Sequence, residues 1–121
     1  MELPIDLEKL KEMVPETIDD AEANIVTVRG RFLLYTRDGV HIMWGRLGNG
    51  IFVGEDNLGV HCWGIYGQGV FAGFYGGEFF HGRYHNGYWK AQYLFGLDYS
   101  GGQYVLFPVN IPSPAITESL P

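Results

Sequence analysis

The sequence predicts an all-β fold, an antiparallel β-hairpin meander that is either an open sheet or a small barrel, preceded by a short α-helical segment. Residues 39–54 are nearly duplicated in residues 59–73, and a fainter third copy covers residues 77–91. All 18 glycines fall between Gly30 and Gly102. Turn signals recur about every ten residues, a spacing typical of all-β folds. This spacing leaves no room for the crossover helices that a parallel sheet requires.

The N-terminal segment is expected to be helical and acidic. A helix is predicted over residues 5–14, with Asp6 as its N-cap and apolar residues at helical spacing. Pro15 ends it. Thr17, with an acid three residues later, resembles a capping box and predicts a second short helix over residues 18–23. The apolar stripe of this segment should pack on the sheet that follows.

The rest of the chain is expected to be short strands joined by tight turns, all within a single domain of residues 1–121. Asp-Gly and Asn-Gly dipeptides favour hairpin turns with positive φ. A meander over residues 25–107 would be followed by a proline-rich tail, residues 108–121, that runs extended or covers a sheet edge. The expected strands are residues 25–28, 31–36, 40–44, 51–53, 60–63, 70–74, 78–84, 88–95 and 103–107. The expected turns are residues 37–39, 48–50, 55–57, 85–87 and 100–102.

Charge and composition exclude several classes of function. The net charge of −6 lies wholly in residues 1–24, which hold eight acids and two lysines; the remainder is balanced. The meander therefore lacks the basic face that nucleic-acid binding requires. A single cysteine, Cys62, fits a reducing compartment. No apolar run has the roughly 18 residues of a membrane span. A cytoplasmic protein without a cofactor is expected.

A second period of about 23 residues appears when an apolar-x-Gly motif is followed along the chain. Its best copy is Tyr75-Gly76-Gly77-Glu78-Phe79-Phe80-His81-Gly82, and related copies begin at Val28, Phe52 and Tyr99. This pattern resembles the MORN repeat, whose hallmark is Tyr-x-Gly-x-aromatic-x-x-Gly. The resemblance covers about two-thirds of the chain. It implies antiparallel hairpins stacked in an elongated sheet, with scaffolding, dimerisation or lipid contact as the usual roles.

A rival period of five residues carries aromatic or apolar side chains from Phe74 to Tyr104 and resembles a pentapeptide β-solenoid. Such a coil needs about 20 residues per turn and several turns. The pattern holds over fewer than two coils. Asn-Gly and Gly-Gly turns favour hairpins instead.

Glycines and aromatic residues are expected to interlock between neighbouring strands. A strand glycine has no side chain to pack. A bulky ring from a neighbouring strand can lie across the bare backbone and bury on the order of 150–250 Å². The rings considered for this role are Trp44, Trp63, Phe71, Phe79, Tyr84 and Trp89.

The aromatic residues are the best functional candidates, because Tyr and Trp on a sheet often contact a sugar, a nucleobase or a protein. If the meander closes into a barrel, its mouth can hold a small ligand. Arg31, Arg83 and Lys90 are then candidates for binding an anionic group. The residues predicted to bind a ligand or partner are Tyr66, Arg83, Tyr84, His85, Tyr88, Trp89 and Lys90.

No catalytic residue and no metal site is predicted. His41 and His61 occupy equivalent positions of the duplicate, but no ligand spacing accompanies them. Glu78 and His81 are expected on opposite strand faces, which disfavours an acid–base pair. Cys62 has no basic neighbour and is expected to be unreactive packing.

The sequence therefore predicts a non-enzymatic binding or assembly protein that uses an aromatic-rich sheet surface to bind a protein partner or itself. An open sheet would have edge strands that invite pairing between copies. The alternative is a small β-barrel that binds or transforms a small molecule in an aromatic-lined pocket with Arg, His or Glu polar groups.

Overall fold

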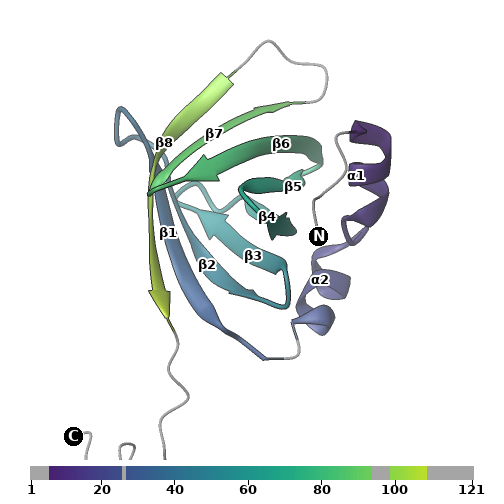
Figure 1. The fold of residues 1–121 in the computed structure, drawn as a ribbon. Helices are drawn as coiled ribbons and strands as arrows, with labels where there is room; N and C mark the ends of the chain where they lie inside the picture. The colour runs from purple at the N-terminus through teal and green to yellow at the C-terminus, as the bar shows by residue number, and fades with distance from the viewer. Residues whose placement is uncertain (1–5, 26, 94–98, 109–121) are drawn as a thin grey trace, which may run out of the picture.

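The fold is an eight-stranded antiparallel barrel with two helices on its outer surface (Figure 1). The computed structural model describes residues 6–25, 27–93 and 99–108. Each strand pairs with the next along the chain, and β1 pairs with β8 to close the barrel. The strands are β1 (Gly30–Thr36), β2 (Ile42–Gly48), β3 (Ile51–Asp56), β4 (His61–Gly67), β5 (Val70–Tyr75), β6 (Glu78–His85), β7 (Tyr88–Tyr93) and β8 (Tyr99–Pro108).

Closure decides between the two architectures that the sequence allows. The predicted antiparallel meander is confirmed, and it is a barrel. In β1, Leu33 lies opposite Trp44 of β2 on one side and Val105 of β8 on the other. A closed barrel has no open edges, so the argument that edge strands drive self-association does not apply to it. Antiparallel pairing of successive strands also excludes the solenoid.

Both N-terminal helices form as predicted. Helix α1 (Leu7–Met13) begins after Asp6, whose carboxylate accepts a hydrogen bond from the Glu8 amide at 3.0 Å. Helix α2 (Ile18–Asn24) begins after Thr17, whose hydroxyl accepts from the Asp20 amide at 3.1 Å. These side chains satisfy amide groups that have no partner within the helix.

The helices pack on the outside of β3 to β6, so their apolar stripes cover the barrel and do not fill it (Figure 1). Leu10 of α1 packs with Ile65 and Phe79 in one buried cluster. The Trp63 indole also points outward, and its Nε1–H donates to the Pro15 carbonyl at 2.8 Å. The outer faces of β4 and β6 therefore carry apolar residues because the helices cover them. Val14 and Ala72 complete the cluster around Leu10, and a second cluster under the helices contains Ala21, Ile25 and Val53.

Each copy of the internal repeat is one β-hairpin. The copies correspond to β2–β3, β4–β5 and β6–β7. Their tips, Asn49-Gly50, Gln68-Gly69 and Asn86-Gly87, have positive φ at both residues. Such paired positive φ values are typical of two-residue hairpins whose twist matches that of the strands. The duplication therefore places chemically equivalent residues at equivalent heights around the barrel.

Two local predictions are wrong. The strand predicted at residues 25–28 is absent from its described residues: Ile25 caps α2, and residues 27–29 lead into β1. Residues 100–102 are not a turn, since they lie inside β8. A Cβ at Gly102 would lie 1.8 Å from the Tyr35 carbonyl oxygen, so glycine is needed where β1 and β8 approach this closely. Residue 26, and parts of two other predictions, residues 94–95 and the tail at 109–121, lie outside the described residues.

A belt of glycines surrounds the middle of the barrel. Gly45 lies opposite Gly54, Gly64 opposite Gly73, and Gly82 opposite Ala91. At the five glycines of these pairs, a Cβ would lie between 2.0 and 2.5 Å from a carbonyl oxygen of the neighbouring strand. The strands therefore approach more closely here than any side chain permits. Glycines at such positions allow the sharp bending that closes a small barrel.

Phenylalanine rings cover this belt from inside. Phe32 lies against Gly45 and Gly54, Phe52 against Gly64, and Phe71 against Gly82, with ring carbons 2.6–2.9 Å from where a Cβ would be. The expected interlocking of glycines and rings is thus present, and Phe71 is one of the rings considered for it. Phe32 and Phe52 are not among those rings. Trp63 and Phe79 pack under the helices instead.

Candidate ligand-binding cavity

The barrel encloses a cavity of about 330 Å³. An eight-stranded barrel is just wide enough for side chains to fill it or for one small ligand. The glycines at mid-height contribute no side chains, and the phenylalanine rings that lie on them leave part of the interior open. Aromatic side chains dominate the lining, and the other ten lining residues are half apolar and half polar. The aromatic residues are Phe32, Phe52, Tyr66, Phe71, Tyr75, Phe80, Tyr84, Trp89 and Tyr104.

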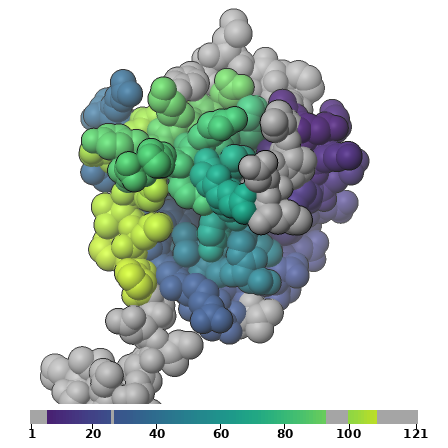
Figure 2. Space-filling model, viewed as in Figure 1, coloured from purple at the N-terminus to yellow at the C-terminus, as the bar shows by residue number. Residues whose placement is uncertain are grey.

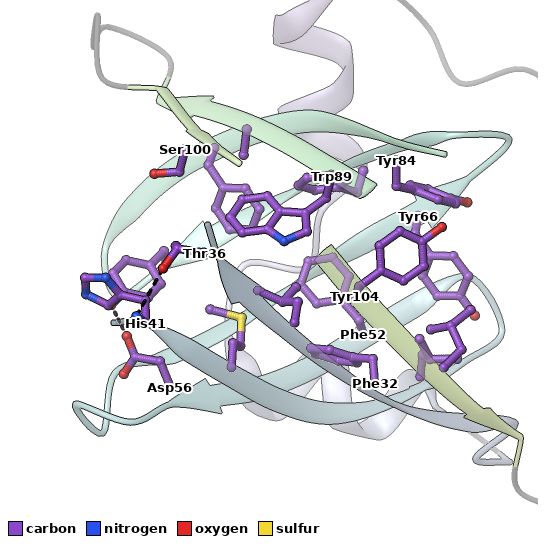
Figure 3. A pocket seen from close by; sticks show the side chains of 18 of the residues that line it. Phe32, Thr36, His41, Phe52, Asp56, Tyr66, Tyr84, Trp89, Ser100 and Tyr104 are labelled. Carbon is purple, nitrogen blue, oxygen red and sulfur yellow. Dashed lines mark hydrogen bonds between the residues drawn. The ribbon is translucent and has the colours of Figure 1, made fainter. Parts of the chain in front are cut away.

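Polar groups gather at the two ends of the cavity (Figure 3). One end, which we call the tyrosine end, is formed by Tyr66, Tyr84 and Tyr104 near the hairpin tips. The opposite end, the Asp56 end, contains Asp56 and His41. Trp89 lies between them, with its Nε1–H donating to the carbonyls of β1 and β8. The cavity therefore has an apolar middle and two chemically different ends.

The three tyrosines are placed by the repeat. The amides of Tyr66, Tyr84 and Tyr104 each donate to the carbonyl of a hairpin-tip glycine, Gly50, Gly69 and Gly87 respectively, at 2.8–2.9 Å. The rings of Tyr84 and Tyr104 meet edge to face, with centroids 6.0 Å apart. Burial raises the pKa of Tyr66, and the nearby Tyr84 adds to this, although the Gly50 amide opposes it. Tyr66 therefore presents a neutral hydroxyl that donates and accepts hydrogen bonds.

Asp56 is the buried charge of the barrel, with 2% of its surface exposed. One carboxylate oxygen accepts from the amides of Leu58 and Val60, each at 2.9 Å, and the other accepts from the Tyr75 hydroxyl. Burial by itself raises the pKa of Asp56, but these three hydrogen bonds, with His41 nearby, outweigh it and lower the pKa below its ordinary value. Asp56 is thus ionised at neutral pH.

The structure divides the predicted binding residues into two groups. Tyr66, Tyr84 and Trp89 line the cavity together. The other four, Arg83, His85, Tyr88 and Lys90, are exposed and lie outside the lining.

The expected anion-binding cations do not reach the cavity. Arg31, Arg83 and Lys90 are all exposed, because they alternate along their strands with residues that point inward. Among the lining residues in the described part of the chain there is no lysine or arginine. The charge that the cavity does contain is the carboxylate of Asp56.

Sequence reasoning missed several cavity residues, including Phe32, Phe52, Asp56, Tyr75 and Tyr104. The repeat contains a signal that identifies three of them, Phe52, Asp56 and Tyr75. Each hairpin has inward positions in register with its glycines, so Phe52 is equivalent to Phe71, and Asp56 to Tyr75. Because side chains alternate between the two faces of a strand, every second residue from the paired glycines of β2–β3 and β4–β5 points inward. These inward positions include Phe52, Asp56, Phe71 and Tyr75.

The remaining candidate residues lie in different surroundings. His41 lines the Asp56 end, whereas His61 is exposed. His81 stacks on Phe79 at 6.3 Å outside the barrel, and burial lowers its pKa. Within the described ranges, no group of three or more His, Cys, Asp or Glu side chains is placed to hold a metal ion.

Cys62 is a packing residue inside the barrel wall, as predicted. It is fully buried, and its thiol donates to the Met43 sulfur at 3.0 Å. Burial, with a smaller contribution from Asp56, raises its pKa to about 12. A thiol with so high a pKa is a poor nucleophile at neutral pH.

Comparison with known proteins gives no family model, no curated protein and no solved structure that matches this chain. None of the helices in the described ranges is long and apolar enough to span a membrane.

Proposed function

We propose that this protein is a non-enzymatic binding protein that holds a small, largely apolar molecule inside its barrel. The observation that carries the proposal is the cavity of about 330 Å³, lined by nine aromatic rings. Ligand sites in proteins are concave, mostly apolar and supplied with a few polar groups that fix orientation. The two polar ends supply such groups here.

The size of the cavity supports this function. At about 330 Å³, its volume falls within the range of about 300–1,000 Å³ that is usual for ligand pockets. Water in an aromatic-lined space makes few hydrogen bonds, and an apolar ligand that displaces it gains binding free energy. The wall is also closely packed, with glycine backbones in contact and the rings of Phe32 and Phe52 meeting edge to face.

Ala91→Leu is expected to abolish ligand binding by filling the cavity. Ala91 lines the cavity beside Trp89, and the added atoms occupy the space that a ligand needs. The probe is N-phenyl-1-naphthylamine, a neutral apolar dye whose fluorescence rises in apolar surroundings. We expect saturable binding of one dye per chain by the natural protein, and at least a tenfold loss in the variant, about 1.4 kcal/mol.

The matched control is Ala23→Leu, the same change on the exposed surface of α2. It should bind the dye as the natural protein does. Native mass spectrometry of the purified protein should also show a retained small molecule in the natural protein and in Ala23→Leu, but not in Ala91→Leu. Undiminished dye binding by a folded Ala91→Leu protein would refute the cavity as the site.

Self-association is a second candidate function, favoured by the outer face of β8, β1 and β2. This outer face, which the helices leave uncovered, carries Leu33, Trp44, Val105 and Phe107; Trp44 is 42% exposed and Phe107 51%. The space-filling view shows β8 at the surface on the side away from the helices (Figure 2). Contiguous exposed apolar residues of this kind mark interaction sites. We propose that two copies bury these faces against each other.

Trp44→Ser tests this second function. Analytical ultracentrifugation should show a dimer of the natural protein and a monomer of the variant, because the large ring at the centre of the face is removed. Dye binding in the cavity should be unchanged, since Trp44 lies outside its lining. A natural protein that stays monomeric at high concentration would rule out the dimer.

A further inference from the structure

In the described part of the chain, the cavity lining contains an acidic side chain without a basic counterpart from lysine or arginine. Asp56 lines the cavity, and among the described lining residues there is no lysine or arginine. The exposed arginines and lysines of the strands lie on the outer surface, where water screens them. A ligand inside the barrel therefore meets a negative charge in surroundings of low dielectric constant, where charge interactions are stronger than in water. An anionic ligand is repelled, and a cationic one is attracted.

The aromatic lining also favours a cationic ligand. The faces of aromatic rings carry partial negative charge and attract cations within about 6 Å of the ring centre. Nine such rings surround the space, among them Trp89 at its middle and Tyr75 at the Asp56 end. Their edges and faces also provide a flat, apolar site for a hydrocarbon body.

Asp56 still has capacity for a ligand. A carboxylate has about four lone-pair sites, and three are used by the amides of Leu58 and Val60 and by the Tyr75 hydroxyl. One further donor can be accepted from the cavity. The neighbouring Thr36 hydroxyl is already engaged, since it donates to Asp38 at 2.6 Å and accepts from the His41 amide at 3.2 Å.

From these observations we propose that the cavity selects an apolar amine, with its ammonium group at the Asp56 end and its hydrocarbon body among the phenylalanine rings. This selection rests on the proposed ligand-binding function and adds the charge class of the ligand. The tyrosine end then accommodates a neutral polar group or the outer part of the body. His41 also lines this end, so an imidazolium there would compete with the ligand for Asp56.

Three probes that share a naphthalene body and differ in charge test the proposal: 1-naphthylmethylamine, 1-naphthalenemethanol and 1-naphthaleneacetate. Binding to the protein is measured by isothermal titration calorimetry at neutral pH, where Asp56 is ionised. The amine should bind at least tenfold more tightly than the alcohol, and the carboxylate should bind more weakly than both. Asp56→Asn, which keeps the shape of the side chain, should reduce the amine's advantage over the alcohol to less than about threefold.

The control is Glu55→Gln, which removes a charge from the residue next to Asp56 on the outer face of β3, outside the cavity lining. It should leave the order of the three probes unchanged. Because the order is measured first in the natural protein, a poorly folded Asp56→Asn does not prevent the test. Equal binding of the alcohol and the amine would overturn the charge selection and leave the ligand-binding function standing. No binding of any probe would overturn both.

Discussion

Gly64→Ala is expected to prevent the barrel from folding, although it adds a single methyl group. That methyl carbon would lie 2.1 Å from the Ala72 carbonyl oxygen and 2.6 Å from Cζ of Phe52. Neither group can move away easily, because Ala72 is held in the β4–β5 ladder and Phe52 is packed in the barrel interior. We expect a loss of more than about 4 kcal/mol in the free energy of unfolding, among the largest effects of single substitutions. Urea denaturation monitored by tryptophan fluorescence measures it.

The control for this prediction lies on the same strand. A Cβ at Gly67 meets nothing within 4 Å, and its φ is not positive. Gly67→Ala should therefore leave stability unchanged or raise it by up to about 1 kcal/mol, since alanine restricts the unfolded chain. If Gly64→Ala proved as stable as Gly67→Ala, the close approach of β4 and β5 would be wrong.

Asp56→Ala is expected to lower the free energy of unfolding by about 3 kcal/mol or more, because three part-buried donors lose their acceptor. The amides of Leu58 and Val60 and the Tyr75 hydroxyl all donate to this carboxylate. Each hydrogen bond to a charged group contributes about 1.5–3 kcal/mol, and stranded buried donors add a desolvation penalty. Thermal unfolding of the variant measures the loss. Glu78→Ala, at an exposed acid that begins β6, should change stability by less than about 0.5 kcal/mol.

The stability that Asp56 contributes should decrease as the pH is lowered. Its pKa in the folded protein lies below the ordinary value of 3.8, so between the two values the unfolded chain binds more protons. The stabilisation is therefore complete above about pH 4 and is lost as the pH falls through the folded pKa. The stability difference between the natural protein and Asp56→Ala should shrink below pH 3.8. A difference that grows on acidification would contradict the assigned hydrogen bonds.

The local elements were predictable because their causes are local. Asp6 and Thr17 define helix starts by hydrogen bonds within three residues. The Asn-Gly tips fix two-residue turns through their own backbone conformations. Where local signals were ambiguous, prediction failed: Gly101-Gly102 is typical of a turn, yet these glycines lie in β8 because strands approach closely there.

The site was harder to predict than the fold. Tyr66, Tyr84 and Trp89 were identified as binding candidates, and they line the cavity. Arg83 and Lys90 belong to the same strands but point outward, since the side-chain period of a strand is two. The role of Asp56 was hidden, because its partner Tyr75 comes from the next hairpin along the chain.

The sequence alone determined the repeated hairpin and the helix starts, because turn conformation and capping depend on neighbours along the chain. It left open whether the sheet closes and which rings lie on the glycines. Only the tertiary structure decided both, since pairing of β1 with β8 joins strands about 70 residues apart, and closure depends on the bending of six intervening strands, five of which contain a glycine. Closure placed one face of every strand inside the barrel. The aromatic residues on those faces therefore line a cavity.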